Sequence, residues 1–283
     1  MDLGLTGKRA LVVGGSRGLG KALAHELVAE GAAVVLAARS EGPLREAVDE
    51  IAALRGTSVE AIFLDVCDPQ SVHDGVDRAA SLLGGIDILV NAAARTGGHG
   101  EEADVYSSAS EEGMVADFNE KVVGSLRLTR AVEPHLRAAG GGRILLFSGG
   151  AGRIRGGLIS AGARNRALNH LVVSLANALG EYGIGCVAVA PSSAITERQM
   201  DAHRRAAELA GVELDEHLAD RARNTTLMRR LVLAGDLAKV ACFLCSPASW
   251  PINAVTVEVA GGSSPDVHYE LKPHPPWRPG TAV

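Results

Sequence analysis

The chain has 283 residues, of which 47% are hydrophobic and 22% are charged, and its formal net charge at pH 7 is −5. This composition can bury a substantial core, so it excludes a disordered chain. The sequence shows neither a basic stripe with interleaved aromatic residues nor an apolar run near the ~20 residues of a membrane span, so we expect neither nucleic acid nor a membrane as a partner.

The chain alternates short apolar segments, typical of buried strands, with longer segments of helical spacing. Strands are predicted at 9–15, 33–38, 59–66, 86–94, 142–150, 184–191 and 253–262. Helices are predicted at 19–31, 43–56, 69–85, 111–139, 158–182 and 234–246, with a further helical stretch at 197–230. Strand–helix alternation of this kind predicts the α/β class: a doubly wound, Rossmann-like parallel sheet of seven strands with helices on both faces.

No linker or internal repeat divides residues 1–262, so we expect a single domain there. The Pro-rich stretch 263–283 is either a loose tail or an arm against a neighbouring subunit. Cys242 and Cys245 form a CxxC inside an apolar helical pattern with no second pair. We therefore expect core thiols rather than a metal site. No secretory signal precedes the first strand, and we expect a reducing, cytoplasmic location.

The stretch "VVGGSRGLG" follows the first predicted strand and opens the first predicted helix. Its glycines, Gly14, Gly18 and Gly20, permit a sharp turn and a close backbone approach to a pyrophosphate. The helix that follows would direct its N–H groups and positive dipole end at that charge. The stretch therefore predicts a dinucleotide site, and the alternative is a plain strand-to-helix turn.

Two arginines favour NADP(H) over NAD(H). A cofactor with a free ribose 2′-hydroxyl usually meets an acidic residue after the second strand, but this chain has Ala38 and Arg39 there, and Arg17 lies in the glycine turn. Two guanidinium groups can pair with a 2′-phosphate. The alternative is that both arginines are solvated surface residues.

Over residues 5–262 the sequence resembles the short-chain dehydrogenase/reductase family. The resemblance is carried by the glycine turn, by Asp65 in "LDV", by Asn91 in "NAAA", by Asn119 in "FNEK" and by the segment from Pro191 to Thr196. Together with the glycine turn and the two arginines, it gives a set of candidate cofactor-binding residues: Gly14, Ser16, Arg17, Gly18, Leu19, Gly20, Arg39, Asp65, Val66, Asn91, Asn165, Pro191 and Thr196.

The chain departs from that family at its catalytic residues. Gly149 stands where the family has its Ser, Ala161 where it has a Tyr, and Asn165 where it has a Lys. Ala161 has no proton to give, and Asn165 carries no charge that could tune a pKa. Of the family's four catalytic positions, this sequence has the family's residue only at Asn119.

Other residues are candidates for the missing proton chemistry. His99 and Tyr106 lie in the stretch after the fourth strand, where loops build such sites. Ser148 ends the fifth strand and could bond a substrate oxygen. A shifted pair, Ser160 and Arg164, lies one turn apart on a helix, but an arginine alone hardly activates a hydroxyl. For each of these the alternative is an ordinary structural or surface role.

The resemblance also implies a helical lid at about 196–230 over the substrate, which suggests a medium-sized molecule. It further implies a homodimer or homotetramer built through the helices at 111–139 and 158–182.

Three functions remain open. The first is an NADP(H)-dependent reductase of a carbonyl, imine or conjugated substrate that barely needs a protein acid. The second is a non-redox isomerase, lyase or cyclase on the same fold. The third is a catalytically inactive cofactor-binding partner protein. The glycine turn, Asp65, Arg17 and Arg39 favour the first over the second.

Overall fold

A computed structural model describes residues 2–55, 59–94, 109–153, 159–192 and 194–263. Its centre is the predicted parallel sheet of seven strands, in the order β3-β2-β1-β4-β5-β6-β7. The fold class expected from the sequence is thus confirmed. The strands are β1 (Arg9–Val13), β2 (Ala33–Ala38), β3 (Glu60–Phe63), β4 (Ile88–Asn91), β5 (Gly142–Phe147), β6 (Ile184–Pro191) and β7 (Val255–Val259).

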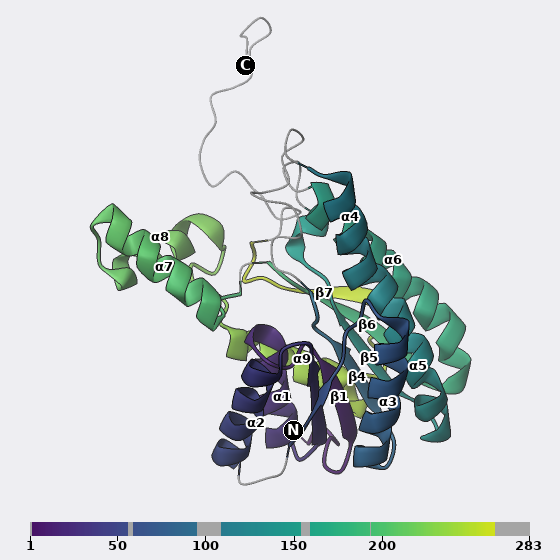
Figure 1. Cartoon of the computed structure of the whole chain (residues 1–283). Helices are drawn as coiled ribbons and strands as arrows, with labels where there is room; N and C mark the ends of the chain where they lie inside the picture. The colour runs from purple at the N-terminus through teal and green to yellow at the C-terminus, as the bar shows by residue number, and fades with distance from the viewer. Residues whose placement is uncertain (1, 56–58, 95–108, 154–158, 193, 264–283) are drawn as a thin grey trace, which may run out of the picture.

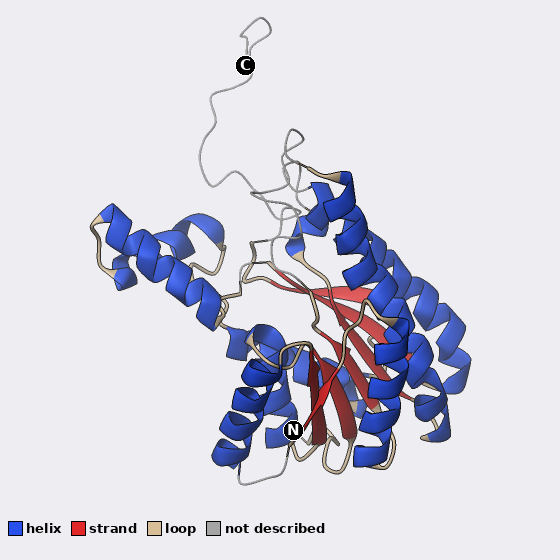
Figure 2. Cartoon of the chain, viewed as in Figure 1, coloured by secondary structure: helices blue, strands red, loops and turns tan. Residues whose placement is uncertain are grey.

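Helices cover both faces of this sheet (Figures 1 and 2). One face carries α1 (Gly18–Ala29), α2 (Glu41–Arg55) and α9 (Ala234–Cys245), and the other carries α3 (Pro69–Leu83), α5 (Gly124–Ala138) and α6 (Ile159–Leu179). The remaining helices are α4 (Glu111–Phe118), α7 (Glu197–Ala210) and α8 (Leu214–Thr225), with short turns η1 (Asn119–Val123), η2 (Gly150–Gly152), η3 (Gly180–Tyr182) and η4 (Pro247–Ser249). None of the helices in the described ranges is long and apolar enough to cross a membrane.

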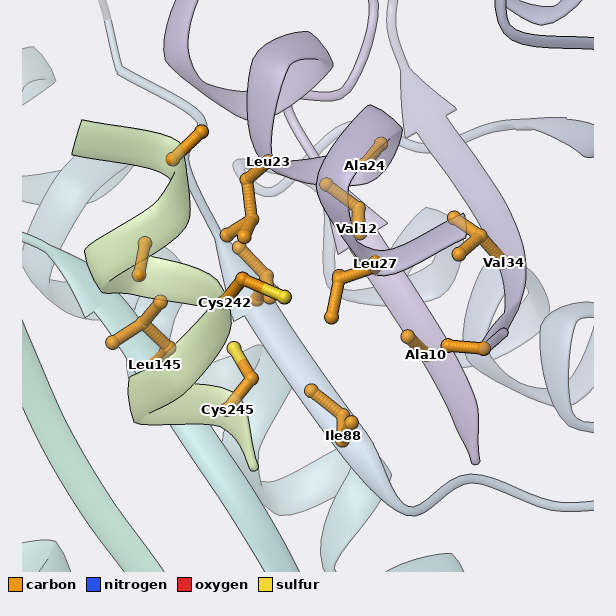
Figure 3. Packing of buried hydrophobic residues seen from close by; sticks show 14 of the residues in the cluster. Ala10, Val12, Leu23, Ala24, Leu27, Val34, Ile88, Leu145, Cys242 and Cys245 are labelled. Atoms are coloured by element: carbon orange, nitrogen blue, oxygen red, sulfur yellow. The ribbon is translucent and has the colours of Figure 1, made fainter. Parts of the chain in front are cut away.

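The core on the α1–α9 side is built mainly from aliphatic side chains. In Figure 3 the thiols of Cys242 and Cys245 on α9 lie among Leu23 and Leu27 of α1 and side chains of the central strands. Both cysteines are at most 2% exposed. Burial raises the pKa of the Cys242 thiol to about 12. The prediction of core thiols at the CxxC is therefore confirmed.

Two elements differ from the sequence prediction. The helix expected over 111–139 is divided by η1, a π-helical turn in which the N–H of Gly124 donates to the carbonyl of Asn119 five residues earlier. The stretch expected to be helical over 197–230 contains two helices, α7 and α8, which project from the body (Figure 1). Their role as a lid stays a prediction, and the tail from 264 lies outside the described residues.

The order of the strands fixes where a ligand can bind. The chain reverses direction across the sheet between β1 and β4, which pair in parallel with Val13 beside Asn91. In open α/β sheets, ligands bind outside the carboxyl ends of the strands at such a reversal point. The ends of β1 and β4, and of β5 and β6 next to them, are therefore where the candidate site is built.

Candidate functional site

The turn between β1 and α1 needs its glycines for steric reasons. Gly14 has a φ of +81°, and a Cβ atom there would lie 2.6 Å from the backbone carbon of Ala92 after β4. A Cβ atom at Gly20 would lie 2.2 Å from the carbonyl oxygen of Gly14. The turn is therefore pressed against the end of β4, and any larger residue would force the two strands' ends apart.

The start of α1 is suited to an anion. Arg17 precedes the helix in an extended conformation with no side-chain cap, and the first turn contains no acidic residue. The positive end of the helix dipole is therefore not offset from within α1. A Cβ atom at Gly18 would meet Thr196, at 3.6 Å from its Cγ2 atom, so two predicted cofactor residues from distant parts of the sequence are neighbours here.

A carboxylate already lies at this helix start. Glu197, the first residue of α7, accepts a hydrogen bond from the backbone of Gly18 and lies 2.9 Å from Nζ of Lys21. Burial alone would raise the pKa of Glu197, but the hydrogen bonds from Lys21 and Gly18 hold it below its usual value. The carboxylate of Glu197 thus places a negative charge at the start of α1, and a pyrophosphate would bring a charge of the same sign to this position.

The residues predicted to read the adenosine half follow β2 and β3. Arg39 comes directly after β2, and its Nη2 atom lies 3.0 Å from Oε1 of Glu120. Asp65 comes after β3, and its Oδ1 atom accepts the N–H of Cys67 at 2.9 Å. The next residue, Val66, is buried. All three lie at the expected edge of the sheet, and their contacts to a cofactor stay a prediction.

Three further cofactor candidates lie at strand or helix ends. Asn91 ends β4 and is buried, with Nδ2 donating to Oγ of Ser125 at 2.9 Å. Pro191 is the last residue of β6. Thr196 precedes α7, and its N–H donates to Oε1 of Gln199 at 3.0 Å. Asn91 therefore fixes the end of β4 against α5, while Thr196 fixes the start of α7.

The π-helical turn η1 directs two charged residues inward. Asn119, the predicted catalytic asparagine, is half-buried at its start. Glu120 and Lys121 follow, and their exposed fractions are 2% and 6%. The Nζ atom of Lys121 donates to the carbonyl oxygen of Ser148 at 3.0 Å, at the end of β5. Sequence reasoning missed Lys121, although two adjacent charges inside a helical pattern were a visible signal.

The end of β5 is closed against α6. Ser148 is buried, and its Oγ atom donates to Oδ1 of Asn169 at 2.5 Å. A Cβ atom on Gly149 would lie 2.7 Å from Nδ2 of Asn165, so the amide of Asn165 fills the space that a side chain at 149 would need. Ala161, on the same helix, is buried as well. The hydroxyl of Ser148 is thus engaged with α6, and its predicted role toward a substrate stays a prediction.

The shifted pair on α6 is bound to one carboxylate. The Oγ atom of Ser160 donates to Asp117 of α4, and Nη1 of Arg164 lies 3.0 Å from the other oxygen of Asp117. All three residues are less than 9% exposed. This network joins α4 to α6. His99 and Tyr106, the predicted proton donors, lie outside the described residues.

The sequence is similar to those of known dehydrogenases and reductases. Residues 8–207 match the family model described as short chain dehydrogenase. A short-chain reductase protein, NovJ of Streptomyces niveus, is 31% identical over 253 residues, which cover 89% of this chain and 92% of NovJ. The 7alpha-hydroxysteroid dehydrogenase of Escherichia coli is 30% identical over 266 residues, covering 92% of this chain and 96% of that enzyme.

Solved structures agree with the fold. L-sorbose reductase from Gluconobacter frateurii, crystallised with NADPH and L-sorbose, superposes with a TM-score of 0.85 at 28% identity, covering 93% of this chain and 98% of that one. A short chain dehydrogenase from Burkholderia cenocepacia in complex with NADP superposes with a TM-score of 0.76 at 32% identity, covering 92% and 99%.

Proposed function

Because this chain belongs to the short-chain dehydrogenase family, we propose that it is an NADPH-dependent reductase of a medium-sized carbonyl, imine or conjugated substrate, working without a tyrosine at position 161 or a lysine at 165. When bound, NADPH supplies a hydride. The residues of the chain bind and orient the cofactor and the substrate, and they handle the proton that balances the reaction.

The carrying observation is the anion site at the start of α1. The carboxylate of Glu197 lies against the backbone of Gly18 and the ammonium of Lys21, which supports a pyrophosphate in the same place. The residues proposed for this half of the cofactor are Gly14, Ser16, Arg17, Gly18, Leu19 and Gly20. The preference for NADPH rests on Arg17 and Arg39, with Asp65 and Val66 beside the adenine.

The nicotinamide half is proposed to lie between the ends of β4, β5 and β6. The residues proposed to surround it are Asn91, Asn165, Pro191 and Thr196. Asn165 has a buried Oδ1 atom with no hydrogen-bond partner among the described residues. An unpaired buried amide oxygen costs free energy, and a ribose hydroxyl would satisfy it. This supports a sugar-bearing ligand rather than a purely apolar one.

The proposed substrate class follows from the absence of a proton-donating side chain at position 161 of α6. With alanine at 161, the substrate must tolerate a weak or displaced acid. An iminium is already cationic, and a polarised C=C bond or a quinone spreads the charge that hydride adds. Asn119 and Ser148, together with His99 and Tyr106, remain the proposed groups around the reacting atoms.

Assembly and location are proposals of the same kind. The helices expected to form a subunit interface carry exposed apolar side chains, Val115 and Val123 on α4 and η1 and Val173 on α6. These support a homodimer or homotetramer. The four cysteines are free thiols, which supports the reducing cytoplasm.

The test is a fluorescence titration of the full chain with NADPH and with NADH. We expect NADPH to bind at micromolar concentration and NADH more weakly. Arg39→Asp should weaken NADPH far more than NADH, whereas Arg78→Asp, an exposed change on α3, should alter neither. A panel containing isatin, cyclohexenone and a cyclic iminium salt then measures NADPH consumption.

Two outcomes would overturn the proposal. Absence of NADPH binding at millimolar concentration would remove the cofactor on which the reductase depends. Tight binding of NADPH without consumption on any of the three acceptor classes would instead point to an inactive partner protein.

A further inference from the structure

Lys121 is a buried titratable group that the proposed function leaves unused. Its side chain runs from η1 to the end of β5, where Nζ donates to the carbonyl oxygen of Ser148 at 3.0 Å. Only 6% of the residue is exposed. A buried ammonium normally requires a carboxylate partner, because the free energy of removing a charge from water is large. Here the bond is to a neutral carbonyl.

The charged groups around Lys121 come from three elements. Arg164 of α6 opposes its positive charge, while Glu120 of η1 and Asp117 of α4 favour it. Both acids are already engaged, Glu120 with Arg39 and Asp117 with Arg164 and Ser160. Burial, followed by the repulsion of Arg164, lowers the pKa of Lys121 to about 7. Lys121 can therefore gain and lose a proton near neutral pH, which is the property of an efficient acid.

The ammonium of Lys121 lies at the end of β5, which packs against the part of α6 that lacks the family's tyrosine and lysine. Lys121 reaches the carbonyl of Ser148, the next residue is Gly149, and a Cβ atom there would touch the amide of Asn165. η1 also packs directly against α6. The end of β5 is thus contacted by a buried proton donor, Lys121. It is also next to Asn165, whose buried Oδ1 atom has no hydrogen-bond partner among the described residues. Each of these groups costs free energy when it is left incompletely paired.

We propose that the ammonium of Lys121, which reaches the end of β5 from η1, is the proton donor of this site, while Asn165 on α6 keeps its role toward a ribose hydroxyl of the cofactor. The proposal rests on the reductase function. The hydride would come from bound NADPH, whose own C–H bond breaks to leave NADP⁺. As the new C–H bond forms at the substrate, the electron pair of its C=O, C=N or C=C bond moves to the far atom. That atom takes a proton from Nζ, and the neutral amine of Lys121 regains one from water.

The first test needs no substrate. With ¹⁵N-lysine labelling of the full chain, the Nζ resonance that disappears in Lys121→Met should titrate with a midpoint near pH 7, while the other lysines stay protonated up to about pH 10. Lys239→Met, an exposed change on α9, should leave that titration unchanged. A Lys121 resonance that remains protonated up to pH 9 would overturn the proposal.

The second test places Lys121 relative to the cofactor. The oxidised nicotinamide ring carries a positive charge and the reduced ring does not, so a nearby ammonium should lose its proton more easily beside the oxidised ring. We expect the midpoint for Lys121 to be lower by half a pH unit or more with saturating NADP⁺ than with NADPH. Equal midpoints would put Lys121 too far from the reacting atoms.

The third test uses reduction of isatin. Lys121→Met should lower kcat by about 10²–10⁴-fold with little change in the affinity for NADPH. In the unmodified protein kcat should fall above pH 7, whereas in Lys121→Arg the fall should disappear. Reduction that is unaffected in Lys121→Met would overturn the role of Lys121 and leave the reductase standing. Absence of NADPH binding to the unmodified protein would instead overturn the proposed reductase function.

Discussion

The guanidinium of Arg39 is held by Glu120, with 3.0 Å between Nη2 and Oε1. Glu120 is 2% exposed, whereas the side chain of Arg39 is 47% exposed. The acid is therefore anchored in η1, and Arg39 reaches it from the end of β2. A ligand phosphate that recruits Arg39 has to compete with this carboxylate.

Glu120→Gln should therefore tighten NADPH binding. The neutral amide removes a negative charge next to Arg39, so we expect the Kd for NADPH to fall several-fold and the Kd for NADH to change little. Fluorescence titration at constant ionic strength measures both. Glu112→Gln, an exposed change on α4, is the matched control. A parallel shift for the two cofactors would show that Glu120 does not act through the 2′-phosphate.

Glu197→Gln should also favour the cofactor, for a different reason. The carboxylate of Glu197 accepts a hydrogen bond from the backbone of Gly18 and pairs with Lys21. Its negative charge should therefore repel an incoming pyrophosphate. We expect NADPH and NADH to bind more tightly by similar factors, as measured by titration calorimetry. Glu208→Gln at the far end of α7 should have no effect. Weaker binding of both cofactors would mean that Glu197 supports the site instead of blocking it.

Lys121 should make the protein more stable in alkali than at neutral pH. Its pKa is about 7 in the folded chain against an ordinary value of 10.5, so the unfolded chain binds a proton that the folded chain has released. The free energy of unfolding therefore rises with pH between about 7 and 10, at up to about 1.4 kcal/mol per pH unit. Urea denaturation at several pH values should show this rise and its loss in Lys121→Met, which should also be more stable at pH 7. A Lys121→Met protein that keeps the same pH dependence would contradict this assignment.

Asp87 should contribute stability that acid removes. It accepts Nε of Arg9 at 2.8 Å and the backbone N–H of Arg9 at 2.9 Å. Burial opposes ionisation, but these bonds hold the pKa of Asp87 below its usual value. The contribution is therefore complete above the unfolded pKa of about 4 and is lost as the pH falls below it. Asp87→Asn should cost about 1–3 kcal/mol at neutral pH in urea denaturation, and Asp77→Asn, an exposed change on α3, should cost almost nothing. An equal cost at pH 7 and pH 3 would show that the charge of Asp87 is not responsible.

The sheet could be predicted from the sequence because each strand is a short apolar run between turn signals. The glycine turn was predictable for a steric reason, since no other residue fits at Gly14 or Gly20. Periodicity could not show that the helix over 111–139 changes to a π-helical turn at Asn119, because one wide turn leaves the overall pattern of apolar residues almost unchanged.

The positions of the predicted cofactor residues at strand ends could be predicted from the sequence, whereas the surroundings of Lys121 could not. Strand ends fix where Asn91 and Arg39 lie, so their neighbourhood follows from topology. The inward direction of Lys121 depends on the local turn of η1, which spacing does not reveal, although the adjacent charges of Glu120 and Lys121 and the glycine at 149 are visible in the sequence. The engagement of Arg39 with Glu120 joins residues 81 apart in the sequence, which only the packing of η1 against the end of β2 reveals.

The contact between Gly149 and Asn165 imposes an order on any redesign of this site. A serine introduced at 149 alone would place its Cβ atom 2.7 Å from the amide nitrogen of Asn165, which is 4% exposed and has little space to move. Position 165 must change first, and only then does a hydroxyl at 149 have room. A change at 149 therefore depends on the residue at 165, and a screen of single substitutions would discard a serine at 149 that a second change at 165 could accommodate.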